Sequence, residues 1–575
     1  MNSKFKDFLI NYFGSGWLFF VPYLMLYLFY WVFELKVSHL FSVFHGLHLI
    51  NVVGLLFLIS KKYRLIKYID TFFWLSLASL FLFTGTYLEY PSDPWEHLRR
   101  IYEWQNLDFI SEASTYKFAY FFGYSLLGWA DPTFRYTNLN LYSTLCLTLL
   151  SYQLYKLALV LGFKNIWAKV AVLSNIFFLG YDCIGFYSYH GISSSQISLL
   201  ASLAAIRSTI SISTKHLQSD AFVVVIALLL AGFNHIQGVL IWFAAFGGIL
   251  ISKLIFHFGL KRIVMILCTT IIVTNIIAIP LTTKFIQDTN FVFNNTFLPW
   301  GGINPFKFDH IYKTLGIIGI INIITAICFV KQNKIIGWIT FMPIIILIIS
   351  CGGLLLMYFL YNHNSPIVAH RLLYACLPLL SLIYFFQIMG TKGYITDEVF
   401  APIVGIILIL LSLFHSSPIF GKSISRFIRI NPNYIINNLD QAIHILSKDL
   451  ILKKDDYILS DSATQFAISS LLGIRSNLPA RTIPASLTFR IEKLGGIQGI
   501  LDKKDIAGVL SLSSQPDIEN VGSLLAKSSG HWDPLLLRKN FRFDDELENR
   551  LDELLQIGWK KSSVAPCYNL YLRPQ

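Results

Sequence analysis

One polar segment of this chain carries residue types that could do chemistry on an anionic substrate. Asp93 precedes a proline, and proline suits the first position of a helix because that position needs no amide donor. Asp93 can therefore cap a helix from which Glu96, His97 and Arg100 project, with Asp93 and His97 four residues apart on one face. The carboxylate could accept a proton from an attacking hydroxyl or bind a divalent metal, and Arg99 and Arg100 could hold a phosphate. The same pattern also fits a capped, solvated helix without a catalytic role.

Further polar residues stand at the mouths of apolar runs. His370 and Arg371 flank the start of a late run, where an Arg is costly unless it faces water, a partner or a ligand. We assign Arg371 a functional role, against the alternative that it extends to the membrane surface. The other candidate positions are Asp182, His190, His235 and His310, and each of the three histidines also fits a hydrogen-bonded packing residue.

The elements that must position these residues are predicted to cross a membrane. The chain has 575 residues, of which 55% are hydrophobic and 14% charged, whereas soluble proteins have about 25% charged residues. Residues 1–415 hold 26 Lys and Arg and 16 Asp and Glu, and residues 416–575 hold 20 and 17. The scarcity of charge in the first part excludes a purely soluble enzyme, a coiled coil and a disordered chain.

About thirteen apolar runs are long enough, or nearly so, to be transmembrane helices. We expect a polytopic helical domain over 1–415, with large outer loops at 89–137 and 283–312, and spans near 13–34, 38–60, 68–88, 138–162, 167–184, 194–212, 220–233, 238–256, 263–282, 313–330, 335–360, 369–390 and 400–415. Lys and Arg concentrate in alternate short loops, which predicts a cytoplasmic N-terminus and an extracytoplasmic C-terminus. The basic residues are scattered among these loops, so nucleic acid is not an expected partner.

Residues 416–575 are predicted to form a soluble α/β domain outside the membrane. Strand-like segments occur at 456–460, 506–512, 559–563 and 568–572, and residues 544–556 have the pattern of an amphipathic helix with acids in its first turn. The segment contains no glycine-rich phosphate loop and no nucleophile elbow. The catalytic residues are therefore expected in the first part of the chain.

The whole arrangement resembles the C-type superfamily of polytopic glycosyltransferases. Asp93-Pro-Trp-Glu-His-Leu-Arg-Arg100 is similar to the Asp-Pro-x-x-His-Leu-Arg stretch of oligosaccharyltransferase catalytic subunits, where the acid lies at the active site. Arg371 resembles the basic residue that these enzymes direct at the carrier phosphate. The chain departs from oligosaccharyltransferases in lacking their Trp-Trp-Asp-Tyr-Gly motif and a second acidic pair.

The resemblance implies an inverting glycosyltransferase in the inner membrane of a bacterium. It would move a sugar from a polyprenyl-phosphate donor to a saccharide, lipid or protein acceptor on the outer face. Asp93, supported by Glu96 and His97, would take the acceptor proton, and Arg371 with His370, Arg99 or Arg100 would bind the donor phosphate. No cofactor is certain, and Asp93 would hold Mg²⁺ or Mn²⁺ if a metal is used.

Two alternatives remain. An O-antigen polymerase or ligase would depend on Arg371 and His310 more than on Asp93. A non-enzymatic flippase or exporter of a lipid-linked saccharide would need polar residues deep in several spans.

Overall fold

The structure is a computed structural model that describes part of the chain. The described residues are 15–33, 43–44, 46–54, 68–84, 100–101, 104, 117–127, 135–178, 194–215, 218–258, 321, 324–326, 328–329, 335–337, 377–393, 395–414, 457–460, 487–512, 545–565 and 568–574. They are mostly helical, as expected for the first part of the chain. The remaining positions include the predicted span at 263–282 and the outer loop at 283–312, which lie outside the described residues.

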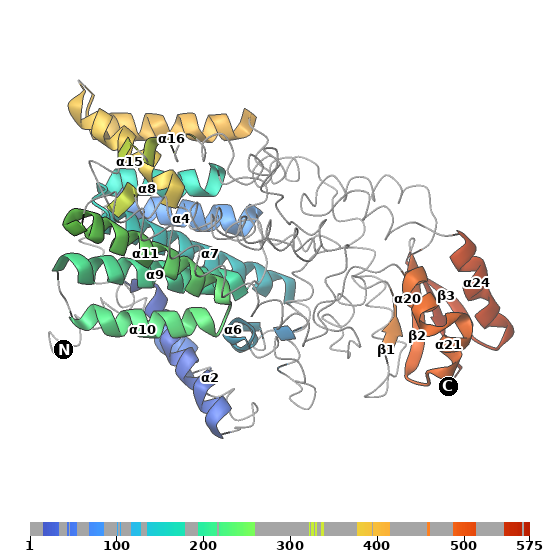
Figure 1. Ribbon diagram of the computed structural model, residues 1–575. Coiled ribbons are helices and arrows are strands. Elements are labelled where there is room, and N and C mark those ends of the chain that lie inside the picture. The colour runs from blue at the N-terminus through green and yellow to red at the C-terminus, as the bar shows by residue number, and fades with distance from the viewer. Residues whose placement is uncertain are drawn as a thin grey trace.

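The first part of the chain is a bundle of helices (Figure 1). Its elements are η1 (Trp17–Phe20), α2 (Val21–Phe33), α4 (Tyr68–Thr84), α6 (Phe118–Leu127), α7 (Arg135–Val160), α8 (Asn165–Phe178), α9 (Ser194–Lys215), α10 (Gln218–Gly232), α11 (Ile236–Phe258), α15 (Leu377–Lys392) and α16 (Asp397–Phe414). Within the described residues, Tyr142–Val160 of α7 is the one helix long and apolar enough to cross a bilayer by length and composition. Several others, including Trp17–Tyr30, Asp220–Gly232 and Ile241–Leu250, are apolar but shorter.

Helix α9 lies at the centre of this bundle, in contact with α7, α10 and α11. Every side chain from Gln196 to Ile206 is buried. Small residues allow the close packing: the Ser202 hydroxyl donates to the Gly238 carbonyl at 2.7 Å, and a Cβ on Gly238 would lie 2.3 Å from the Ser198 hydroxyl oxygen. Only glycine fits at position 238, so α11 and α9 approach with almost no side-chain volume between them.

The helices α10 and α16 are apolar on their outward as well as their inward faces. In α10 the exposed side chains Phe222 (69% exposed), Val225 and Leu229 follow helical spacing, and Ala227 and Leu230 are buried opposite them. In α16 the exposed side chains are Val399, Ile403, Ile406, Ile407 and Leu410. A helix that is apolar all round needs an apolar environment on each side.

Helix α6 was not predicted as an element. Its ten residues lie within the region expected to be an outer loop, and they are too few to span a bilayer, so no span was assigned there. In the structure all described side chains from Phe118 to Ser125 are buried, and the helix packs against α2, α7 and α9. The predicted loop therefore contains a buried helix.

The two ends of the bundle are defined by their turns. At one end the Tyr142 hydroxyl of α7 donates to the Ala119 carbonyl of α6 at 3.2 Å. Val160 ends α7 about 27 Å further along the axis, at the 1.5 Å rise of an α-helix. There the chain reverses through Gly162, whose φ of +94° suits glycine, and the Phe163 amide donates to the Ala158 carbonyl at 3.0 Å.

The described C-terminal residues form a four-stranded sheet of order β1-β2-β4-β3 (Figure 1). The first two strands are parallel and the other pairs antiparallel. The elements are β1 (Tyr457–Leu459), α20 (Leu487–Leu494), α21 (Gly496–Asp502), β2 (Ile506–Leu512), α24 (Asp545–Gln556), β3 (Lys560–Ala565) and β4 (Tyr568–Leu572). The bounds of β2 and β4 match the predicted segments. Helix α24 buries Leu547, Leu551 and Leu554, one turn apart, against the sheet.

Candidate functional site

The structure describes two of the predicted site residues, Arg100 and His235. Both belong to the same end of the bundle, which we call the aromatic end and define by Arg100, Trp104, Tyr120 and Asn234. The other predicted residues lie outside the described residues: Asp93, Glu96, His97, Arg99, Asp182, His190, His310, His370 and Arg371. Their roles stay predictions.

Arg100 is buried, with 5% of its surface exposed. Its guanidinium lies 5.8 Å from the centre of the Tyr120 ring, in the geometry of a cation–π contact. The following residue, Ile101, packs directly over Gly123, where a Cβ would approach the Ile101 side chain to 2.6 Å. The end of the polar motif is thus embedded in the bundle, so Arg100 does not project from a solvated helix face.

Aromatic side chains surround this segment. Trp104 is fully buried, and its ring lies 5.3 Å from Tyr30, 5.4 Å from Phe121 and 6.3 Å from Tyr27, measured between ring centroids. Tyr27 in turn packs edge-on against Phe233 at 5.8 Å. Offset and edge-on contacts of this kind add to the burial of apolar area. These packed rings surround Arg100 with largely apolar side chains.

The turn between α10 and α11 belongs to the same end. Asn234 is 1% exposed, and its side-chain oxygen accepts a hydrogen bond from the Ala119 amide at 2.8 Å, while the Phe118 amide donates to the Phe233 carbonyl at 3.2 Å. Asn234 therefore satisfies an amide in the first turn of α6 that has no partner inside the helix.

His235 is half-buried and is held through its backbone. Its carbonyl accepts a hydrogen bond from the Ser198 hydroxyl at 2.5 Å, and its amide donates to the Ala231 carbonyl at 2.9 Å. Because Ala119 and Tyr120 are adjacent, the Asn234 contact brings His235 and Arg100 to one end of the bundle.

A buried hydrogen-bond network beside α6 was missed from the sequence. The His48 ring lies 2.8 Å by Nδ1 from the Tyr23 hydroxyl and 3.0 Å by Nε2 from the Ser125 carbonyl, and Asn51 Nδ2 donates to Tyr23 at 3.1 Å. A carbonyl can only accept, so Nε2 carries a proton. Nδ1 is then free to accept the phenol proton, which makes the neutral ring the form that satisfies Tyr23. The sequence signal was a histidine and an asparagine inside one apolar run.

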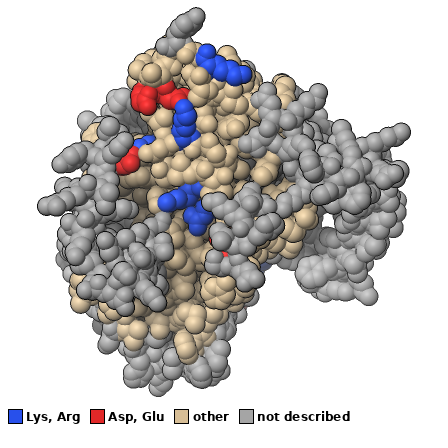
Figure 2. Space-filling model, turned by 90° about the vertical axis from the view of Figure 1, so that its left-hand side faces the viewer, with Lys and Arg blue, Asp and Glu red and all other residues tan. Residues whose placement is uncertain are grey.

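Ionic contacts dominate the opposite end, which we call the charged end and define by Asp70, Lys164, Lys169 and Asp397. Lys164 pairs with Asp397, and Lys169 pairs with Asp70. Figure 2 looks onto the left-hand end of Figure 1 and shows described basic and acidic side chains gathered there. None of these four residues was predicted as a site residue from the sequence.

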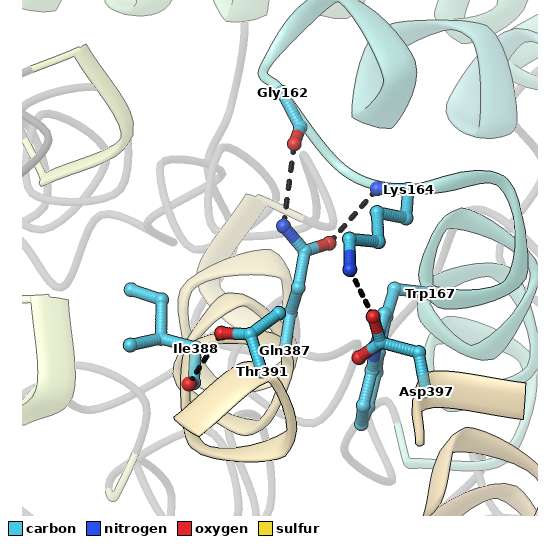
Figure 3. A network of polar contacts seen from close by, with 7 residues as sticks. All are labelled: Gly162, Lys164, Trp167, Gln387, Ile388, Thr391 and Asp397. Atoms are coloured by element: carbon cyan, nitrogen blue, oxygen red, sulfur yellow. Dashed lines mark hydrogen bonds and ion pairs between the residues drawn. The ribbon is translucent and has the colours of Figure 1, made fainter. Parts of the chain in front are cut away.

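One hydrogen-bond network at the charged end links the connection between α7 and α8 to α15 and to the start of α16 (Figure 3). Asp397 also accepts from the Trp167 indole at 3.0 Å, and Gln387 accepts from the Lys164 amide at 2.9 Å. The hydrogen bond from Lys164 lowers the pKa of the Asp397 carboxyl, burial opposes this, and the Trp167 donor adds to the lowering. The net pKa of Asp397 lies below its usual range.

The described residues hold no group of three or more His, Cys, Asp or Glu side chains that would suit a metal ion. Asp93, the predicted metal ligand, lies outside them. What the aromatic end offers chemically is a buried cation among largely apolar side chains, which suits an anionic group held at one side of the bundle.

Comparison with known proteins gives no assignment, because neither a scan against family models nor a search of curated proteins finds a match.

Proposed function

We propose that this chain is a polytopic membrane glycosyltransferase that moves a sugar from a polyprenyl-phosphate donor to an acceptor on the outer face of the membrane. The burial of Arg100 at the end of the Asp93 motif carries the proposal. A guanidinium costs free energy to bury without an anion or an aromatic face to stabilise it, and Tyr120 supplies the face. An anionic substrate at this end would meet a cation that the bundle holds in place.

The outward apolar faces of α10 and α16 support a membrane location. Water would solvate these stripes poorly, whereas the hydrocarbon of a bilayer matches them. The buried interface between α9 and α11 is built from Ser198, Ser202 and Gly238, the small and hydroxyl-bearing residues that allow close helix packing in a bilayer. About thirteen spans, an outer C-terminal α/β domain and the relation to C-type glycosyltransferases are part of this proposal.

In the proposed reaction Asp93 is the general base. The acceptor hydroxyl loses its proton to the Asp93 carboxylate as its oxygen forms a bond to the anomeric carbon of the sugar. The bond between that carbon and the phosphate oxygen breaks, and the carrier phosphate leaves with the electron pair, so the configuration inverts. Arg371 and Arg100 would stabilise the charge that grows on the phosphate.

The decisive experiment measures release of polyprenyl phosphate or diphosphate from a panel of synthetic lipid-linked sugars by purified full-length protein. Asp93→Asn should abolish release, a loss of at least about 100-fold, because removal of a general base typically costs that much. Asp108→Asn, which neutralises another acid of the same predicted loop, is the matched control and should retain activity. Normal turnover by Asp93→Asn would refute the mechanism.

The same purified protein and lipid-linked sugars distinguish two other functions. An O-antigen polymerase or ligase predicts loss of activity in Arg371→Gln but not in Asp93→Asn. A flippase predicts lipid movement without a new covalent product. The buried polar side chains described on α7, α8 and α9 between the two ends, such as Ser151, Gln153 and Asn175, are uncharged, which favours a one-sided site over a polar route through the bundle.

A further inference from the structure

Two neighbouring cations at the charged end have a different environment from the ion pairs beside them. Lys156 on α7 follows Tyr152 by one helical turn, and its ammonium lies 5.2 Å from the centre of the Tyr152 ring. Arg207 comes from α9, which packs against α7, and its guanidinium is within electrostatic range of both Lys156 and Tyr152. Both side chains are half-buried.

Among the described residues, neither cation has a counter-ion in contact. Lys164 and Lys169 each pair with an aspartate, but Lys156 and Arg207 form no hydrogen bond or ion pair with the described residues. Asp220 of α10 acts on Arg207 from beyond ion-pair distance. Two half-buried like charges repel each other and lose part of their hydration, so an anion placed between them would stabilise both.

The surroundings indicate which anion fits. The Trp74 ring of α4 lies 5.4 Å from Tyr152 and 5.5 Å from Tyr155, between ring centroids, so that aromatic side chains stand beside the cations. Trp and Tyr concentrate at the level of lipid headgroups, and basic clefts between transmembrane helices bind headgroup phosphates. A guanidinium fork beside an ammonium matches the oxygens of a phosphate.

We propose that Lys156 and Arg207 bind the phosphate of an anionic phospholipid headgroup at the charged end, opposite the aromatic end that holds Arg100. The bound phosphate links α7 to α9. The lipid as the source of the phosphate rests on the membrane location proposed above, whereas the phosphate chemistry rests on the two cations alone.

The test is a thermal-unfolding titration of the purified full chain in a neutral detergent. Short-chain phosphatidylglycerol should raise the unfolding midpoint of the wild type, and phosphatidylcholine should not. Lys156→Gln and Arg207→Gln should each weaken the apparent affinity for phosphatidylglycerol about fivefold, the loss expected for one cation at a headgroup. Lys392→Gln is the matched control, because Lys392 is an exposed base at the end of α15.

The outcomes separate the possibilities. The proposal fails if phosphatidylglycerol has no effect on the wild type, if phosphatidylcholine acts equally, or if both variants respond as the wild type does. Inorganic phosphate acting as strongly as phosphatidylglycerol would overturn the lipid source. If the Gln variants do not fold, Arg207→Lys serves instead. It keeps the charge, so its apparent affinity for phosphatidylglycerol must be at most slightly weaker than that of the wild type. Asp93→Asn should retain the full lipid response, so this site and the glycosyltransferase proposal can fail independently.

Discussion

The two ends of the helical bundle hold their helices together by different physical means. At the charged end, Asp397 joins the start of α16 to the start of α8 through an ion pair with Lys164 and a hydrogen bond from the Trp167 indole. At the aromatic end, the helices are joined by a neutral hydrogen bond to Asn234 and by packing of aromatic rings around Trp104. The aromatic end holds Arg100, the one arginine of the polar motif among the described residues, and it is buried. At the charged end two lysines are paired with aspartates, whereas at the aromatic end the Arg100 guanidinium lies against the face of Tyr120.

The largest expected effect tests the packing that joins the aromatic end to α9. Gly238→Val would force side-chain atoms into the Ser198 backbone, whose carbonyl oxygen would lie 2.5 Å from a Cβ. We expect a loss of about 3 kcal/mol or more, because overpacking against backbone cannot relax. Thermal unfolding and the monodisperse fraction after solubilisation measure it. Gly232→Ala, where the nearest atom lies at 3.8 Å, is the control and should be tolerated.

An intermediate effect compares the same substitution at the two ends. Asn234→Ala leaves the Ala119 amide buried without its acceptor, which should cost about 2 kcal/mol. Asn165→Ala at the charged end removes an exposed hydrogen bond from the Tyr155 hydroxyl and should cost much less. Equal losses of the unfolding midpoint in the two variants would contradict the view that the aromatic end depends on buried neutral hydrogen bonds.

A smaller effect is expected for Asp397→Asn. The Lys164 ammonium is half-exposed and its pair contributes little, so the loss comes mainly from weakening the acceptor of the buried Trp167 indole, about 1 kcal/mol. Glu398→Gln removes an exposed neighbouring acid and serves as the control in the same denaturation series.

The pH dependence of that variant has a fixed sign. The folded pKa of Asp397 lies below the unfolded value of about 3.9, so its contribution to stability is fully present above that pH and is lost as the pH falls through the folded pKa. The difference in unfolding free energy between the wild type and Asp397→Asn should therefore hold from pH 8 to about pH 5 and shrink below about pH 4. A difference that grows on acidification would rule out this assignment.

Local sequence patterns predicted the elements whose identity depends on their own residues. The strands at 506–512 and 568–572 and the helix at 545–556 follow from residue type and hydrophobic spacing, and the structure has them. Long apolar runs such as 138–162 and 194–212 likewise became α7 and α9. Helix α6 could not be predicted in this way, because a ten-residue apolar segment is equally consistent with a short span, a buried helix or a loop.

The sequence by itself determined three features through its composition and residue order. They are a mostly helical, apolar first part, a tail with an ordinary share of charged residues, and a polar motif from Asp93 to Arg100. What only the tertiary structure decided is which of those polar residues are buried and what they meet. Tyr120 lies under Arg100, Asn234 satisfies α6 across 115 residues of chain, and Lys156 stands near Arg207 from another helix. The reason is that hydrophobic spacing selects an element and its faces, whereas contacts between residues far apart depend on how those faces pack.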